Sequence, residues 1–341
     1  DSYDNTVGIE NVADGVLVGG TTQGMTFPTG TGGYQSAFAS GNDAYVALFS
    51  KDLSAIIKYS YYGGSGLDKM KSMTTDESGS VFFVGETTSP DLPISVGAAG
   101  QIYRSQIDGF VVKLDKALTK LDISTYIGGN KDDMPEAVAV DMSGNVFVCG
   151  GTTSTADFPT ALGHQKTLGG QVDGFLCRLS PNGSTYGFST YFGKEGIETF
   201  TALAVNSGGE PFVTGTTNSA NFETAPTPNR WSSGRLPYDR TFNGGNTDAF
   251  VIKFFSDGTL SKRDDGTYST YFGGNGDDVG RGIFVDQSGR AVVVGTTTST
   301  NLPTLSSYAS QPIGRRDIFM AVLADDGRAL ASCTYFGGTG D

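Results

Sequence analysis

The chain has 341 residues, of which 37% are hydrophobic and only 17% charged, so its composition predicts a folded protein rather than a solvated tail. Its net charge of −13 argues against a nucleic-acid binder, which needs a positive surface, and no apolar stretch is long enough to span a membrane. Its 50 glycines do not recur at every third residue, which excludes collagen, and frequent Val, Thr, Tyr and Phe between glycine-rich turns indicate an all-β fold.

In chain order, one set of predicted elements recurs five times. Strand a ends at an Asp turn, as in "AVAVD" from residue 137, and strand b follows, as in "VFVCGGTT" from residue 146. A Phe/Leu-Pro element ("FPT" from 158, but "FET" from 222) leads to strand c, as in "DGFLCRL" from 173, and strand d carries the phrase "STYFG" from 189. One tyrosine of that phrase marks each repeat: Tyr61, Tyr126, Tyr191, Tyr271 and Tyr335. An insertion lengthens the fourth repeat.

These elements predict a repeated antiparallel sheet. Alternating apolar residues in strands b and c predict buried faces, and the Asp-x-x-Gly turn predicts an a–b hairpin. Four antiparallel strands in tandem repeats are typical of a β-propeller. The pattern "VDxxGxxxVxGTTxSxxFPT…DAFVxKL…STYFGG" resembles the SBBP-type β-propeller repeat over essentially the whole chain. That resemblance implies a surface or secreted protein of bacteria or archaea; the family name refers to seven blades, whereas five repeats fill this chain.

We therefore predict an all-β fold: one five-bladed β-propeller domain over residues 1–341, with four antiparallel strands in each blade of about 65 residues. The blades run approximately over residues 1–66, 67–131, 132–196, 197–276 and 277–341. Because the repeats fill the chain in a whole number, we expect them to close into a ring; an open arc would expose two apolar blade faces.

Acidic residues recur at two positions that the alternating strands place at the same ends of the blades. The first position, on the d-to-a loop, is held by Asp68, Asp133, Glu198, Asp278, and Asp1 or Asp341. The second position begins strand c and is held by Asp43, Asp108, Asp173, Asp248 and Asp317. Clustered carboxylates suit Ca²⁺. Residues repeated in every blade more often cap backbone N–H groups, so we favour capping and keep calcium as the alternative; no other cofactor is expected.

Ligand specificity in a repeat protein should lie where the repeats differ. The aligned starts of strand a differ: Thr6, Lys71, Glu136, Thr201 and Arg281. Their mixed charges could hold a polar ligand near the propeller axis or face a water-filled channel. Glu136 is the one non-repeated acid among them, whereas glycosidases need a pair of carboxylates in distinct environments.

The insertion of the fourth repeat is a second place of difference. Its b-to-c loop from Thr224 holds aromatic and arginine side chains: Trp231, Arg230, Arg235, Tyr238 and Arg240. Such residues on an exposed loop are typical contacts for proteins or sugars. The alternative is a proline-anchored loop whose tryptophan forms a small core of its own.

The remaining chemistry-bearing residues favour structural roles. Cys149 and Cys177 lie in strand patterns, so we expect buried thiols rather than a disulfide. The one histidine, His164, lies in a loop; a single histidine excludes a multi-histidine metal site and argues against a Ser-His-Asp triad. Asn182-Gly183-Ser184 matches a glycosylation sequon, but Asn-Gly also suits a hairpin turn, which we favour.

The sequence therefore favours a non-catalytic structural or adhesive module, secreted or on the cell surface, that contacts a protein partner or an extracellular assembly. Binding of glycans through equivalent pockets between blades is the alternative. A glycoside hydrolase is less favoured, and neither nucleic acid nor membrane insertion is expected.

Overall fold

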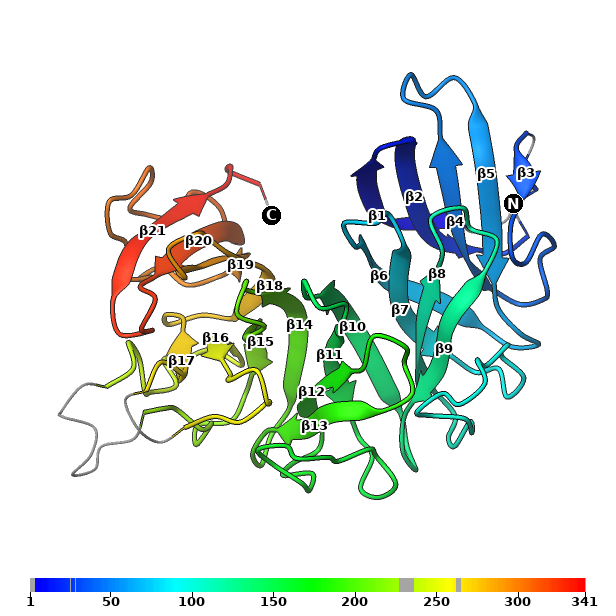
Figure 1. Cartoon of the computed structure of the whole chain (residues 1–341). Helices are drawn as coiled ribbons and strands as arrows, with labels where there is room; N and C mark the ends of the chain where they lie inside the picture. The colour runs from blue at the N-terminus through cyan, green and yellow to red at the C-terminus, as the bar shows by residue number, and fades with distance from the viewer. Residues whose placement is uncertain (1–3, 25, 28, 227–235, 262–264, 341) are drawn as a thin grey trace. The chain divides into compact units, whose positions relative to one another are not determined.

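The computed structural model describes residues 4–340 except 25, 28, 227–235 and 262–264 (Figure 1). The described residues form strands and no helix, so no helical segment among them could cross a membrane. Five antiparallel sheets of four main strands each follow one another along the chain, and in each the strand order is the chain order a-b-c-d. The predicted four-strand repeat is thus confirmed, and we call each sheet a blade.

The strands take the positions that the sequence pattern gives them. Strand a is β1 (Asp4–Val12), β6 (Asp68–Thr75), β10 (Asp133–Val140), β14 (Glu198–Val205) and β18 (Asp278–Val285). Strand b is β2 (Gly15–Thr22), β7 (Val81–Thr87), β11 (Val146–Thr152), β15 (Pro211–Thr217) and β19 (Ala291–Thr297). Strand c is β4 (Asp43–Phe49), β8 (Asp108–Leu114), β12 (Asp173–Leu179), β16 (Asp248–Lys253) and β20 (Asp317–Leu323). Strand d is β5 (Ile56–Tyr62), β9 (Leu121–Ile127), β13 (Tyr186–Phe192), β17 (Tyr268–Phe272) and β21 (Leu330–Phe336).

One short strand was not predicted. β3 (Thr31–Gly32) lies in the b-to-c connection of the first blade and pairs in parallel with β5. Two residues without a periodic apolar pattern leave no signal from which a strand could be inferred.

The chain divides into two compact units. The first comprises residues 1–148, 152–159 and 178–187, and the second comprises 149–151, 160–177 and 188–341. The first and second blades belong wholly to the first unit, the fourth and fifth blades to the second, and the strands of the third blade are shared between the two. The single domain and the ring closure stay predictions.

Each compact unit is held together by apolar side chains between consecutive blades. In the first unit, Tyr62 of β5 packs on Phe83 of β7 and Phe110 of β8, with ring centroids 5.6 and 5.3 Å apart. In the second, Phe272 of β17 packs on Phe319 of β20, with ring centroids 4.9 Å apart. These rings are almost completely buried, so they supply much of the hydrophobic stabilisation.

The a-to-b turns have the predicted chemistry. In the second blade, Asp76 Oδ1 accepts hydrogen bonds from the backbone N–H groups of Ser78 and Ser80, and Gly79 has a φ of 84° that only glycine adopts freely. The same arrangement recurs at Asp141, Asn206 and Asp286.

Two smaller predictions are also confirmed. Cys149 and Cys177 are buried in their strands and are not joined by a disulfide, and Cys333 is buried likewise. Asn182 lies in a turn, where its Oδ1 accepts a hydrogen bond from the backbone N–H of Ser184.

Candidate functional site

Buried carboxylates lie in pairs where one blade follows another. The acid that begins strand c of one blade and the acid that begins strand a of the next approach a shared glycine, the first of the "GG" in the repeated phrase. A Cβ placed on Gly128 would lie 2.8 Å from Asp108 Oδ1 and 3.0 Å from Asp133 Oδ2, so the two carboxylates leave no room for a side chain. This close approach explains why the repeat keeps glycine there.

The strand-a acids are surrounded by donors that also belong to the repeat. Asp68 accepts hydrogen bonds from the hydroxyls of Thr87 and Ser89, and from the backbone N–H of Gly64 at 2.7 Å. Equivalent backbone N–H groups donate to Asp133, Glu198 and Asp278. These acids therefore tie the d-to-a loop to the end of strand b.

In the first blade the corresponding acid is Asp4, not Asp1 or Asp341 as the sequence pattern suggested. Thr22 Oγ1 donates to Asp4 Oδ1 at 2.6 Å, in the way that Thr87 donates to Asp68. Asp1 and Asp341 lie outside the described residues. The bulge of β1 also makes Val7, rather than Thr6, the counterpart of Lys71. The alignment failed because the N-terminal repeat lacks the preceding phrase that fixes the register elsewhere.

The strand-c acids accept backbone N–H groups from the b-to-c loop before them. The donors to Asp43, Asp108, Asp173, Asp248 and Asp317 are Ala39, Arg104, Gly169, Asn243 and Ile313, all at 2.6–2.7 Å. Burial raises the pKa of Asp43 to about 6 and that of Asp248 to about 7, and the neighbouring strand-a carboxylate adds to both shifts. Within the described ranges, no three or more His, Cys, Asp or Glu side chains converge as a metal site would require.

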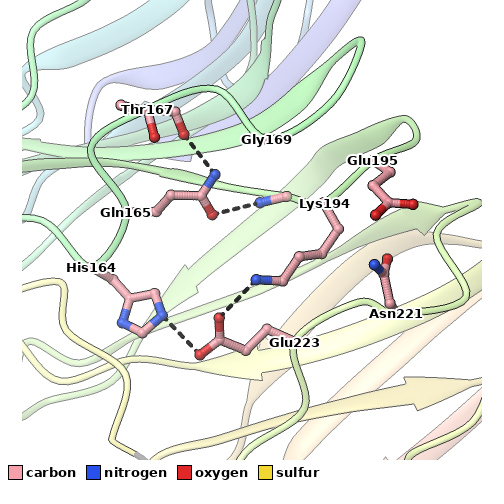
Figure 2. A pocket seen from close by; sticks show the side chains of 9 residues that line it. His164, Gln165, Thr167, Gly169, Lys194, Glu195, Asn221 and Glu223 are labelled. Atoms are coloured by element: carbon pink, nitrogen blue, oxygen red, sulfur yellow. Dashed lines mark hydrogen bonds and ion pairs between the residues drawn. The ribbon is translucent and has the colours of Figure 1, made fainter.

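A polar pocket of about 400 Å³ lies where the fourth blade follows the third, wholly within the second compact unit. His164 and Lys194 both reach Glu223 there: His164 Nε2 lies 3.1 Å from Glu223 Oε1, and Lys194 Nζ lies 3.3 Å from Glu223 Oε2 (Figure 2). Glu195 and Asn221 line the other side of the lysine. The three interacting residues are distant in sequence and come from two b-to-c loops and a d-to-a loop.

All three residues depart from the repeat. Lys194 stands where the other repeats have glycine: Gly64, Gly129, Gly274 and Gly338. Glu223 stands where they have proline: Pro28, Pro93, Pro159 and Pro303. The backbone N–H of the repeated tyrosine, Tyr191, donates to the carbonyl oxygen of Gln165, and His164 directly precedes Gln165. The residues at the same place in the other repeats are Tyr34, Ala99, Tyr238 and Tyr308. The sequence analysis considered each of these residues separately and missed the cluster. A search of the aligned repeats for positions where a charged residue replaces glycine or proline would have found Lys194 and Glu223.

Electrostatics make the cluster a fixed polar surface. The hydrogen bond from His164, aided by the charges of His164 and Lys194, lowers the pKa of Glu223 to about 2, although partial burial opposes the shift. His164 also stacks on Phe192, with ring centroids 5.7 Å apart. Gln165 is committed to the fold, because it bonds Gly193 N, Thr167 O and Asp173 Oδ2, as Gln35 does at equivalent groups of the first blade.

A second pocket of about 470 Å³ lies at the junction between the second and third blades, within the first compact unit. Its lining includes Tyr103 and Arg104 from one b-to-c loop, and Lys131 and Asp132 from the d-to-a loop. The hydroxyl of Tyr103 donates to Gln106 O at 2.7 Å. Two consecutive blade junctions thus carry polar pockets at the same ends of their blades.

Of the predicted residues at the start of strand a, Lys71 and Glu136 contact each other, whereas Arg281 belongs to the second compact unit. Lys71 Nζ lies 2.8 Å from Glu86 Oε1 and 3.2 Å from Glu136 Oε1. Burial would lower the pKa of Lys71, but the bonds and charges of these two glutamates raise it overall. Glu86 was not singled out from the sequence, since it lies at a "GTT" position of strand b. Arg281 is exposed on β18.

The predicted contact loop of the fourth repeat is described only in part. Trp231, Arg230 and Arg235 lie outside the described residues. Tyr238 packs on the apolar core of the second compact unit, where burial raises its pKa to about 12. Arg240 is exposed. Tyr238 therefore anchors the end of the loop.

The five blades and their repeated junctions define the class: the chain is a five-bladed β-propeller. Residues 122–159 and 267–303 match the family model for the SBBP β-propeller repeat. The chain thus carries SBBP repeats, which confirms the resemblance seen in its sequence.

Comparison with other proteins adds little. No match was found among curated proteins. A DUF4221 family member from Bacteroides vulgatus aligns at 9% identity and a TM-score of 0.32, covering 98% of this chain and 88% of the other. A mutant of the GH43 protein BlXynB from Bacillus licheniformis aligns at 9% identity and a TM-score of 0.34, covering 97% of this chain and 57% of the other. Sqt1 from Chaetomium thermophilum aligns at 8% identity and a TM-score of 0.30, covering 99% of this chain and 90% of the other. Scores and identities this low carry no information on function.

Proposed function

We propose that this propeller is a non-catalytic recognition module, secreted or on the cell surface, with an adhesive or structural role. It contacts a protein partner or an extracellular assembly through the blade ends formed by the d-to-a and b-to-c loops. One observation carries this proposal: at two consecutive junctions a glycine of the repeat is replaced by lysine, and each lysine lines a pocket. The repeated acids at these blade ends hydrogen-bond to the loops and hold them in place. The residues that depart from the repeat, Lys131 and Lys194, do not have this role and are available for binding.

The chemistry of the better-defined pocket favours binding over hydrolysis. A glycosidase needs one carboxyl group whose raised pKa keeps it protonated as the acid. Glu223 has the opposite property, because His164 and Lys194 hold its pKa at about 2. A carboxylate that is bound by His164 and Lys194 stays ionised and orients these side chains, so it does not deliver a proton at neutral pH.

Glycan binding is the second candidate, favoured by the presence of a polar pocket at each of two consecutive blade junctions. Volumes of about 400 and 470 Å³ suit a small saccharide, and the linings offer amide, carboxylate and ammonium groups for sugar hydroxyls. Weak equivalent sites on one chain would gain avidity on a surface that presents many copies of the glycan.

A variant that restores the repeat tests the proposal. Lys194→Gly combined with Glu223→Pro returns both positions to the residues found in the other repeats and should leave the fold intact. We expect this variant to bind more weakly than the parent to a glycan array or a panel of purified surface proteins, measured by surface plasmon resonance. Lys116→Ala removes an exposed charge from a c-to-d turn, at the opposite blade ends, and is the matched control.

Two outcomes would contradict the proposal. The first is binding that survives both the restored junction and the change Lys131→Gly, which restores a repeat glycine at the preceding junction. The second is hydrolysis of chromogenic glycosides by the parent that disappears in Glu223→Gln or Glu136→Gln, which would establish an enzyme.

A further inference from the structure

The two pockets differ in their charge. At the junction of the third and fourth blades, Glu223 forms an ion pair with Lys194 and also contacts His164. At the junction of the second and third blades, Arg104 and Lys131 are both exposed, and among the described residues neither side chain has an ion-pair partner. Of the charged residues that line this pocket, Arg104 and Lys131 are cations and Asp132 is an anion, and the charge of Arg104 also acts on the buried Asp108 behind it. Two exposed cations side by side in a pocket lining can attract an anion, even on a chain of net charge −13.

Lys131 replaces a glycine of the repeat, and at Gly66 and Gly276 in other repeats there is no space for a side chain. Its counterparts are Gly66, Gly196, Gly276 and Gly340. A Cβ on Gly66 would lie 2.5 Å from Thr88 Oγ1, and one on Gly276 would lie 2.6 Å from Thr298 Oγ1. Those threonines accept the backbone N–H of the following residue, Leu67 or Asp277.

The third blade makes room for the lysine in two ways. Thr153 donates its hydroxyl to the carbonyl oxygen of Asp132, instead of accepting the N–H of that residue as its counterparts do. The connection from Thr152 to Phe158 is also one residue longer than that from Thr87 to Leu92. Asn130 holds the longer loop, because its Oδ1 accepts the N–H groups of Thr155 and Ala156.

The remaining groups suit a charged sugar. An arginine guanidinium presents a planar fork that matches a carboxylate or sulfate, and a neighbouring ammonium adds a point charge. Tyr103 supplies an aromatic ring at the pocket wall, and Gln106 supplies an amide. We propose that the pocket between the second and third blades binds an acidic saccharide, whose carboxylate or sulfate group is held by Arg104 and Lys131. This inference rests on the proposed recognition function and names the ligand class of one of its pockets.

Isothermal titration calorimetry of the whole chain tests the inference, with trigalacturonate as the carboxylate probe, a sulfated galactotriose as the sulfate probe and maltotriose as the neutral reference. We expect binding of at least one acidic probe, weaker at high salt, and no binding of maltotriose. Lys131→Gly and Arg104→Ala should each weaken binding by about tenfold, the usual loss for one charge-assisted hydrogen bond. Lys116→Ala should not change it.

Lys131→Gly inserts the residue that the other repeats carry, so its fold should be retained, and a thermal melt checks this. Equal binding by the parent and both pocket variants would overturn the inference, as would tight binding of maltotriose. Competition by inorganic sulfate at the same concentration as the saccharides would show a simple anion site and would also overturn it. If no acidic probe binds while the surface-binding assay still depends on Lys194 and Glu223, this inference fails and the recognition function stands.

Discussion

The hydroxyl of Tyr126 donates a hydrogen bond to the carbonyl oxygen of Ser89 at 2.8 Å and accepts one from the backbone N–H of Leu92 at 3.1 Å. Tyr271 and Tyr335 make the same pair of bonds in the fourth and fifth blades. The tyrosine of the repeated phrase thus ties strand d to the b-to-c loop of its own blade. It recurs because every blade needs that tie.

Removal of this hydroxyl should destabilise the protein. Tyr126→Phe leaves the N–H of Leu92 and the carbonyl of Ser89 buried without a partner, so we expect the free energy of unfolding to fall by about 1–3 kcal/mol. Urea denaturation followed by fluorescence measures the change. Tyr103→Phe is the control, because its hydroxyl makes one exposed bond and should matter less. Equal effects of the two substitutions would contradict this role for the tyrosine.

The aromatic side chains of strand c should matter more than any hydrogen bond. Phe110 and Phe250 are fully buried. Phe110 packs on Tyr62 of the first blade and on Phe83 of strand b, and Phe250 packs on Phe200 of strand a and on Phe222. We expect Phe110→Ala and Phe250→Ala to cost roughly 3–5 kcal/mol each, through lost apolar contact and a residual cavity. Denaturant midpoints would measure both. Variants that unfold like the parent would show that these rings do not form part of the apolar core.

The paired carboxylates predict a decline in stability as pH rises. Burial raises the pKa of Asp248 to about 7, above the value near 3.8 expected in the unfolded chain. The native state therefore keeps a proton that the unfolded state has released, and the stability gained below pH 4 is lost as pH rises through 7. Asp43 and Asp133, each with a pKa of about 6, act in the same direction.

Asp248→Asn isolates one of these groups. The amide imitates the protonated carboxyl and keeps an oxygen to accept the N–H of Asn243. We expect the variant to lose less stability than the parent between pH 4 and 7, measured as the midpoint of thermal unfolding across that range. Asp14→Asn, at an exposed turn, should behave as the parent does. A pH profile of Asp248→Asn that parallels the parent's would exclude a proton held at this site.

Calcium should have little effect on stability. The repeated acids already accept backbone N–H groups, whose positive ends occupy the directions that a cation would need. We therefore expect the same melting temperature in EDTA and in added Ca²⁺, with no stoichiometric metal in the purified protein. A calcium-dependent rise in melting temperature, lost in Asp248→Asn or Asp43→Asn, would instead support a cation at the carboxylates whose Oδ1 atoms have no donor among the described residues.

The sequence predicted what every repeat shares, and the site lies in what the repeats do not share. The strand order, the a-to-b turns and the recurring acids could be inferred because every blade needs the same residues at the same positions, so the pattern recurs five times in the sequence. The cluster of His164, Lys194 and Glu223 could not, since His164 and Glu223 are 59 residues apart and each alone is an ordinary loop residue. Their meeting depends on the way one blade follows the next, which no periodicity within a strand encodes.

Lys131 also bears on how proteins of this kind change by recombination. The pocket that it lines takes the lysine and Arg104 from one repeat, and the lengthened loop that accommodates the lysine from the next. Exchange of a single repeat would transfer only half of this arrangement, and a lysine arriving alone would collide with the threonine of an unaltered neighbour. The pocket arrangement is therefore transferred only by an adjacent pair of repeats, and a designer who wishes to move it must graft both.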